Sequence, residues 1–197
     1  TEPPPPACTL TQTRYRFFAF ADAAASSTAS AAENVGVTVS IGGQTSARIK
    51  LAATVADCTE RAIVLQYSDA LGGTYVDVGA NCTSADVCYA NSSGTVDGEI
   101  LTSERLTSDQ AGVEDGFVFE SPSGRLYFGT GSLNSDVENV FQLQMKSTLG
   151  AGTVRYLRIA GVDTYTQTPT VTIASASSPG GAGHTGGVTK SGGGTFK

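Results

Sequence analysis

Four cysteines are the residues whose type and spacing most directly indicate chemistry: Cys8, Cys58, Cys82 and Cys88. None of them forms a CxxC pair, and the single histidine, His184, cannot complete a Cys2His2 zinc site. We therefore expect neither a structural metal nor a bound cofactor. Two disulfide bonds, formed in an oxidising compartment, explain the cysteines better.

The sequence leaves the pairing of these cysteines open. A hairpin built around residues 69–73 would bring Cys58 and Cys82 to its open end. This favours Cys58–Cys82 and leaves Cys8–Cys88 to hold the N-terminal segment. The rival is Cys82–Cys88, because a loop of only five intervening residues closes easily.

Groups suited to catalysis are few. A hydrolase triad needs a positioned base, and His184 lies in a glycine-rich segment that offers no rigid surroundings. Paired carboxylates could serve a glycosidase or bind calcium, but most of them lie in polar stretches typical of solvated loops. The sequence therefore predicts that the protein is not an enzyme. The carboxylates considered are Asp97, Glu99, Glu104, Glu114, Asp115, Glu120, Asp136 and Glu138.

Charge and composition exclude two classes of partner. The net charge of −6 argues against nucleic acid, which is bound through clustered cations. No apolar run approaches the roughly 18 residues of a membrane-spanning helix, so membrane insertion is not expected. Glycans are a possible partner or modification, since Asn81-Cys-Thr and Asn91-Ser-Ser match the N-glycosylation pattern.

The elements that must position these groups are strands, because apolar residues alternate with polar ones along most of the chain. Residues 61–68 place Ile63, Leu65 and Tyr67 on one face, and residues 139–146 do the same with Phe141, Leu143 and Met145. Gln142, Gln144 and Lys146 then face away from the core. Other expected strands are 10–20, 35–40, 46–55, 74–78, 98–102, 116–120, 125–128, 154–160 and 170–174.

Turn residues separate the strands, as in Gly42-Gly43 and Gly72-Gly73. Residues 21–33 and 79–97 are expected to be loops, and residues 103–115 form a polar connection that could hold a short helix. Short strands at this spacing predict an all-β fold: an antiparallel β-sandwich, Ig-like or jelly-roll-like, with extended N- and C-terminal arms.

Several segments together resemble a β-sandwich module of secreted and cell-surface proteins of bacteria. The resemblance implies a surface-exposed building block with no established catalysis, and it supplies no active-site residues. It spans residues 12–174. The motifs that carry it are QTRYRF (12–17), AEN (32–34), LQYS (65–68), YVDVG (75–79), ENVFQL (138–143), YLRI (156–159) and DTYTQTPTVTIA (163–174).

Both ends of the chain are too poor in apolar residues to fold by themselves. Eight residues of the segment 175–197 are glycine, and the N-terminal segment 1–9 contains four consecutive prolines, which favour an extended polyproline conformation. We therefore expect a sandwich domain over residues 10–174, with arms that are held in place by neighbouring copies of the chain. The residues expected to act in assembly are Pro3, Pro4, Pro5, Pro6, Val188 and Phe196.

The function predicted from these features is a structural subunit of an extracellular filament or cell-surface assembly. Its partners would be copies of itself, coupled by arms that pack on or add strands to neighbouring subunits. The chain resembles a secreted product from which a signal peptide has been removed. The alternative is a surface binding module, such as an adhesin or carbohydrate-binding domain, and a viral decoration or tail protein is a third possibility.

Overall fold

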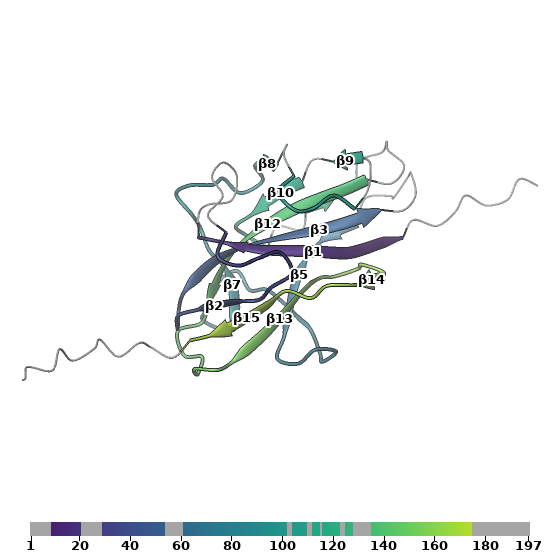
Figure 1. Ribbon diagram of the computed structural model, residues 1–197. Coiled ribbons are helices and arrows are strands. Elements are labelled where there is room, and N and C mark those ends of the chain that lie inside the picture. Colours follow the sequence, from purple (N-terminus) through teal and green to yellow (C-terminus); the bar gives the residue numbers. More distant parts are fainter. Residues whose placement is uncertain are drawn as a thin grey trace, which may run out of the picture.

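The structure is a computed structural model, which describes residues 9–20, 29–53, 61–101, 104–109, 112–114, 116–122, 125–127 and 135–174. These residues form strands, turns and irregular segments without a helix, arranged as two sheets packed face to face (Figure 1). The predicted all-β sandwich is thus confirmed. Cys8, Cys58 and the expected assembly residues Pro3–Pro6, Val188 and Phe196 lie outside the described residues.

The first sheet has the strand order β14-β1-β3-β12-β10-β8, with β7 and β9 also paired to β12. Its strands are β1 (Leu10–Phe18), β3 (Gln44–Ala53), β7 (Val87–Tyr89), β8 (Ile100–Leu101), β9 (Gly112–Glu114), β10 (Gly116–Phe119), β12 (Ser135–Met145) and β14 (Thr164–Tyr165).

The second sheet has the order β2-β15-β13-β5-β6, and a separate pair is formed by β4 and β11. Their bounds are β2 (Val37–Val39), β4 (Arg61–Ile63), β5 (Leu65–Ser68), β6 (Val76–Asp77), β11 (Arg125–Tyr127), β13 (Val154–Ile159) and β15 (Thr170–Ile173). The β5–β6 pairing, Gln66 with Asp77 and Tyr67 with Val76, is the hairpin that residues 69–73 predicted.

Strand β12 organises the first sheet, because both of its edges are paired. One edge runs antiparallel to β3 over ten residue pairs, from Ser135 with Ala53 to Gln144 with Gln44. The other edge meets β9, β10 and β7 in turn along its length. The long pairings are antiparallel, as expected, whereas β1–β14, β10–β12, β9–β12 and β2–β15 are parallel, so both sheets are mixed.

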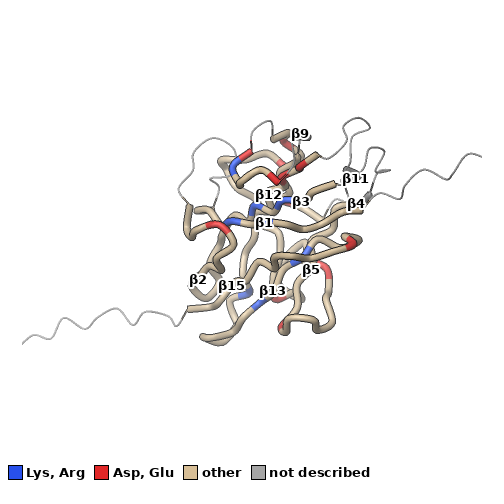
Figure 2. The backbone as a smooth tube through the Cα atoms, turned by 45° about the vertical axis from the view of Figure 1, so that its right-hand side comes forward, with Lys and Arg blue, Asp and Glu red and all other residues tan. Residues whose placement is uncertain are grey.

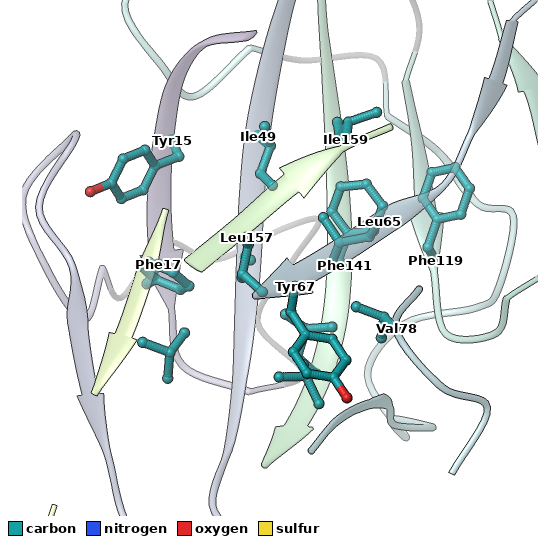
Figure 3. Close-up of a cluster of buried hydrophobic side chains, with 14 of the residues drawn as sticks. Tyr15, Phe17, Ile49, Leu65, Tyr67, Val78, Phe119, Phe141, Leu157 and Ile159 are labelled. Atoms are coloured by element: carbon teal, nitrogen blue, oxygen red, sulfur yellow. The ribbon is translucent and has the colours of Figure 1, made fainter. Parts of the chain in front are cut away.

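The core lies between the two sheets (Figure 3). Phe17, Ile49 and Phe141 come from the first sheet, and Leu65, Leu157 and Ile159 face them from the second. All six of these side chains are at most 1% exposed. The apolar faces predicted for residues 61–68 and 139–146 are therefore the faces that fill the sandwich. Burial of this apolar surface is the main favourable contribution to folding.

The disulfide bond joins Cys82 to Cys88, with the two Cα atoms 5.2 Å apart. The favoured pairing of Cys82 with Cys58 and of Cys88 with Cys8 is therefore wrong, and the rival pairing is correct. The physical reason is local. The Gly79 amide donates to the Val87 carbonyl and the Tyr89 amide donates to the Gly79 carbonyl, so the chain between them doubles back and brings the two cysteines together.

Candidate assembly sites

A groove lies beside strand β2, at the edge of the second sheet. Its volume is about 620 Å³, and it runs between β2 and the neighbouring ends of β1 and β3. Uncharged and mostly small side chains line it, so the groove suits a slim, uncharged occupant. Its lining is Phe18, Ala19, Ser30, Ala31, Ala32, Val35, Gly36, Val37, Thr38, Val39, Ser40, Gly43, Gln44 and Thr45.

The backbone of β2 is open toward this groove. Within the described residues β2 pairs only with β15, where the Ala174 amide donates to the Val39 carbonyl at 2.7 Å. In a strand, the N–H and C=O of one residue point to the same side, and successive residues point to opposite sides. Since the Val39 carbonyl points toward β15, the N–H and C=O of Thr38 point away from β15 and into the groove. Such an edge is a template for an added strand.

The side chains with most charge lie elsewhere, on the outer face of the first sheet. Alternation along β3 and β12 turns Arg48, Lys50, Asp136 and Glu138 away from the core, yet each of them is at most 3% exposed. Lysine and arginine positions gather with acidic ones around β1, β3 and β12 (Figure 2). The expectation of solvated carboxylates is therefore wrong for Asp136 and Glu138. It is also wrong for Glu120, which is buried at 8% exposed.

The segment 104–109 is what covers these charges. The Arg105 and Leu106 amides donate to the Glu138 carboxylate at 2.9 and 2.8 Å, and the Asp109 amide donates to Asp136. In return the Lys50 ammonium donates to the Thr107 carbonyl at 2.9 Å. Backbone groups and buried charges thus satisfy one another, which is the condition for keeping charges out of water.

Ion pairs within the outer face complete this arrangement. Lys50 Nζ lies 3.1 Å from Glu104 and 3.2 Å from Asp136, and the Arg48 guanidinium contacts Glu138. Burial disfavours the charged form of Lys50, but the bond to Glu104 and the nearby carboxylates outweigh it and raise its pKa. A catalytic base needs access to substrate, and these enclosed carboxylates lack it. We interpret them as structural.

Arg14 fastens the far end of the covering segment. Its guanidinium pairs with Asp109 at 2.7 Å and with Glu33 at 2.9 Å. The bond to Arg14 lowers the pKa of Asp109. Burial opposes ionisation of Glu33, but the bonds from the Thr107 amide and from Arg14 overcome it and lower that pKa too.

A second surface feature is an aromatic cleft on the outer face of the second sheet. Leu157 and Ile159 point into the core, so Arg158 between them points outward. Its guanidinium lies 3.9 Å from the ring centroid of Tyr75 and 5.6 Å from that of Tyr165. The cleft has a volume of about 270 Å³, and its lining is Leu71, Gly72, Tyr75, Arg158, Tyr165 and Thr168.

Gln66 holds the cleft arginine in place. It is the cross-strand neighbour of Arg158, and its Oε1 accepts from Nε and Nη2 of that arginine, each at 3.1 Å. Its Nε2 donates to Asp77. Nη1 of Arg158 has no hydrogen-bond partner among the described residues, so one edge of the guanidinium is available to a ligand.

The structure places both predicted glycosylation positions at the surface. Asn81 and Asn91 are both exposed, and the Asn81 side chain accepts a hydrogen bond from the Thr83 amide. Sequence reasoning did not identify the cleft, because Tyr75, Arg158 and Tyr165 come from three separate segments. The alternation of Leu157, Arg158 and Ile159 was the available signal that Arg158 faces outward.

Comparison with known proteins identifies no relative. No family model matches the chain, and neither a curated protein nor a solved structure is significantly similar to it. Within the described part of the chain, no three His, Cys, Asp or Glu residues are grouped to hold a metal ion. The same part contains no helix long and apolar enough to cross a membrane.

Proposed function

We propose that this protein is a structural subunit of an extracellular filament or cell-surface assembly, in which residues 175–197 of one copy add to the β2 groove of another. The observation that carries the proposal is the edge of β2 that no other described strand pairs with, within an uncharged groove lined mostly by small side chains. Backbone hydrogen bonds from Thr38 would supply affinity, as in other cases of strand addition. The Cys82–Cys88 disulfide is compatible with an extracellular location.

The composition of the segment 175–197 matches this groove. Eight of its residues are glycine, and most others are serine, threonine or alanine, so it can lie close to another backbone. The only sizeable apolar side chains in it are Val188 and Phe196, which would act as anchors.

The placement of the chain ends favours an open chain of subunits. The described chain begins beside β1 on one side of the domain and leaves β15 on the other, near β2 (Figure 1). The 23 residues after Ala174 span about 75 Å when extended, whereas a domain of this size is about 40 Å across. The segment can therefore pass along a neighbour to its groove, and such head-to-tail contacts build an open filament where the rotation between neighbours does not close a ring.

Substitutions at Thr38 test the groove. Thr38→Pro removes the N–H that faces the groove, and edge strands tolerate proline at such positions. We expect the full-length variant to remain folded and to lose polymerisation in sedimentation velocity and negative-stain microscopy. Thr38→Val keeps the N–H and serves as the control. Polymers of unchanged length in Thr38→Pro would contradict the proposal.

Deletion of residues 175–197 tests the donor. The shortened chain is expected to fold as a soluble monomer, because residues 10–173 supply the core that the structure describes between the two sheets. If it still forms the same assembly, the segment is not the donor. Dispersed full-length particles that bind glycans on an array would instead support the alternative function of an adhesin or carbohydrate-binding module.

A further inference from the structure

The aromatic cleft offers a second contact, distinct from the β2 groove. It combines two tyrosine rings, the exposed side chain of Leu71, which is 67% exposed, and the guanidinium of Arg158. Grooves lined with aromatic side chains recognise proline-rich segments, because a polyproline helix is already ordered and loses little entropy on binding.

The chain carries a segment with the matching chemistry. Residues 1–7 read Thr-Glu-Pro-Pro-Pro-Pro-Ala, so an acidic side chain precedes four prolines. Proline rings stack on tyrosine faces, and the Glu2 carboxylate can accept from Nη1 of Arg158, which no described residue occupies. We infer that the cleft of Tyr75, Arg158 and Tyr165 binds the Glu2–Pro6 segment of a second copy of this chain.

The topology favours a contact between copies over one within a copy. Strand β14 runs parallel to β1, and Tyr165 lies beside Gln12, further along β1 than Leu10. Residues 1–8 precede Leu10, so the same chain would have to reverse direction before reaching its own cleft. The prolines cannot make that reversal, because their φ angles are fixed and the polyproline helix is stiff, so it would have to fall within residues 7–9, between the prolines and Leu10.

The inference rests on the proposed function, since it assumes self-association, but it concerns the other arm and another face. In an assembly, the β2 groove would hold the C-terminal segment of one neighbour and the cleft would hold the N-terminal segment of a neighbour. Two contacts per subunit raise the effective concentration of each, so a modest affinity at the cleft is enough.

Charge reversal provides the test. Glu2→Arg and Arg158→Glu are each expected to weaken self-association of the full chain by about tenfold in sedimentation velocity, because each places like charges together. A mixture of the two single variants restores the pair only between different copies, so the mixture should associate more tightly than either variant alone. Lys146→Glu, a reversal outside the cleft, is the control for net charge.

A direct measurement uses a fluorescent peptide of sequence TEPPPPA. The peptide should bind the full-length Glu2→Arg protein, whose own arm competes weakly, and binding should fall about tenfold when Arg158→Glu is added. A peptide with glycine in place of the four prolines should bind less well.

The outcomes separate this inference from the proposed function. If the peptide does not bind and mixing restores nothing, while Thr38→Pro still abolishes polymers, the cleft inference is wrong and the groove proposal stands. If restoration occurs only in the Glu2→Arg/Arg158→Glu double variant and not in the mixture, the contact lies within one chain, which also overturns the inference. Glycan binding that Arg158→Glu removes, without any change in association, would assign the cleft to a sugar instead.

Discussion

Glu138 is the residue on which the outer face of the first sheet depends most. Its carboxylate accepts from the Arg105 and Leu106 amides and pairs with Arg48 and Lys50, and Glu138, Arg48 and Lys50 are themselves buried. Removing one partner of a buried ion pair is costly, because the remaining charges stay desolvated. Glu138 therefore stabilises the fold as a buried partner of these groups, and it is not placed to reach a substrate.

Glu138→Gln is therefore expected to lower the free energy of unfolding by about 3–5 kcal/mol. The amide keeps the shape of the side chain but leaves Arg48 without its counter-charge. Urea denaturation at neutral pH measures the effect, with Glu99→Gln as the control, which should change stability by less than about 0.5 kcal/mol. Equal stability of Glu138→Gln and the parent would show that the buried charges are not coupled as described.

The pH dependence of stability follows from Asp109 and Glu33, whose pKa values are both lowered in the folded protein. Their stabilisation is therefore present above the unfolded pKa values, near 4, and is lost as the pH falls through the folded ones. Urea midpoints should fall between pH 5 and pH 3. Arg14→Leu removes the shared partner, so the fall should be smaller in that variant. An equally steep fall in Arg14→Leu would point to other carboxylates.

At the scale of the element, Gly116 allows β10 to follow β9 along the same edge of β12. From Glu114 to Val118 the chain advances four residues, while the facing β12 advances three, from Val137 to Val140. Over this stretch the chain of β9 and β10 therefore contains one residue more than β12. A Cβ at Gly116 would lie 1.7 Å from the Glu138 carbonyl oxygen, which is a steric clash. Glycine has no Cβ and therefore fits at this position.

Gly116→Ala is expected to destabilise the protein by about 3 kcal/mol or more, at the upper end of the cost of overpacking. The matched control is Gly150→Ala, where the nearest neighbouring atom, Thr153 Oγ1, lies 3.8 Å from the new Cβ. Thermal unfolding of both variants compares the two glycines. A Gly116→Ala protein as stable as Gly150→Ala would mean that β10 does not approach β12 as closely as the structure has it.

The apolar face of each long strand was predictable from the sequence, because alternation is a local signal. The β5–β6 hairpin was predictable for the same reason, from the turn residues 69–73. The segments that cover the opposite face of β12 were not predictable from the sequence. Gln142 reads as a solvent-facing residue, yet it is fully buried, since distant segments cover that face of the sheet. Glu138 is bonded to amides more than 30 residues away, a relation that alternation does not encode.

The short strands and the disulfide were missed for related reasons. Strands β7 and β14 contain three and two residues, too few for a periodic pattern, and their partners lie far away in the chain. The preference for Cys58–Cys82 considered only the end of the hairpin, whereas hydrogen bonds between Gly79 and Val87 fold the following segment onto itself.

At the scale of the whole molecule, the position of the chain ends relative to the open edge determines what kind of assembly is possible. A copy that donates residues 175–197 and accepts the same segment at its β2 groove has two different surfaces, so each added subunit exposes a new unoccupied groove or donor segment. The assembly can then keep adding subunits as the protein concentration rises. An exchange of segments between two copies would instead stop at a dimer.

A chain shortened to residues 1–174 can accept a neighbour's segment but cannot donate one, so it should terminate growth. Adding it to the full-length protein at about one part in ten is expected to shorten the filaments, because each incorporated copy blocks one end. The same shortened chain with Thr38→Pro can neither donate nor accept, and should leave filament length unchanged. Length distributions from negative-stain microscopy measure both. If the shortened chain leaves filament length unchanged, or if the full-length protein never exceeds a dimer, head-to-tail addition through the β2 groove is wrong.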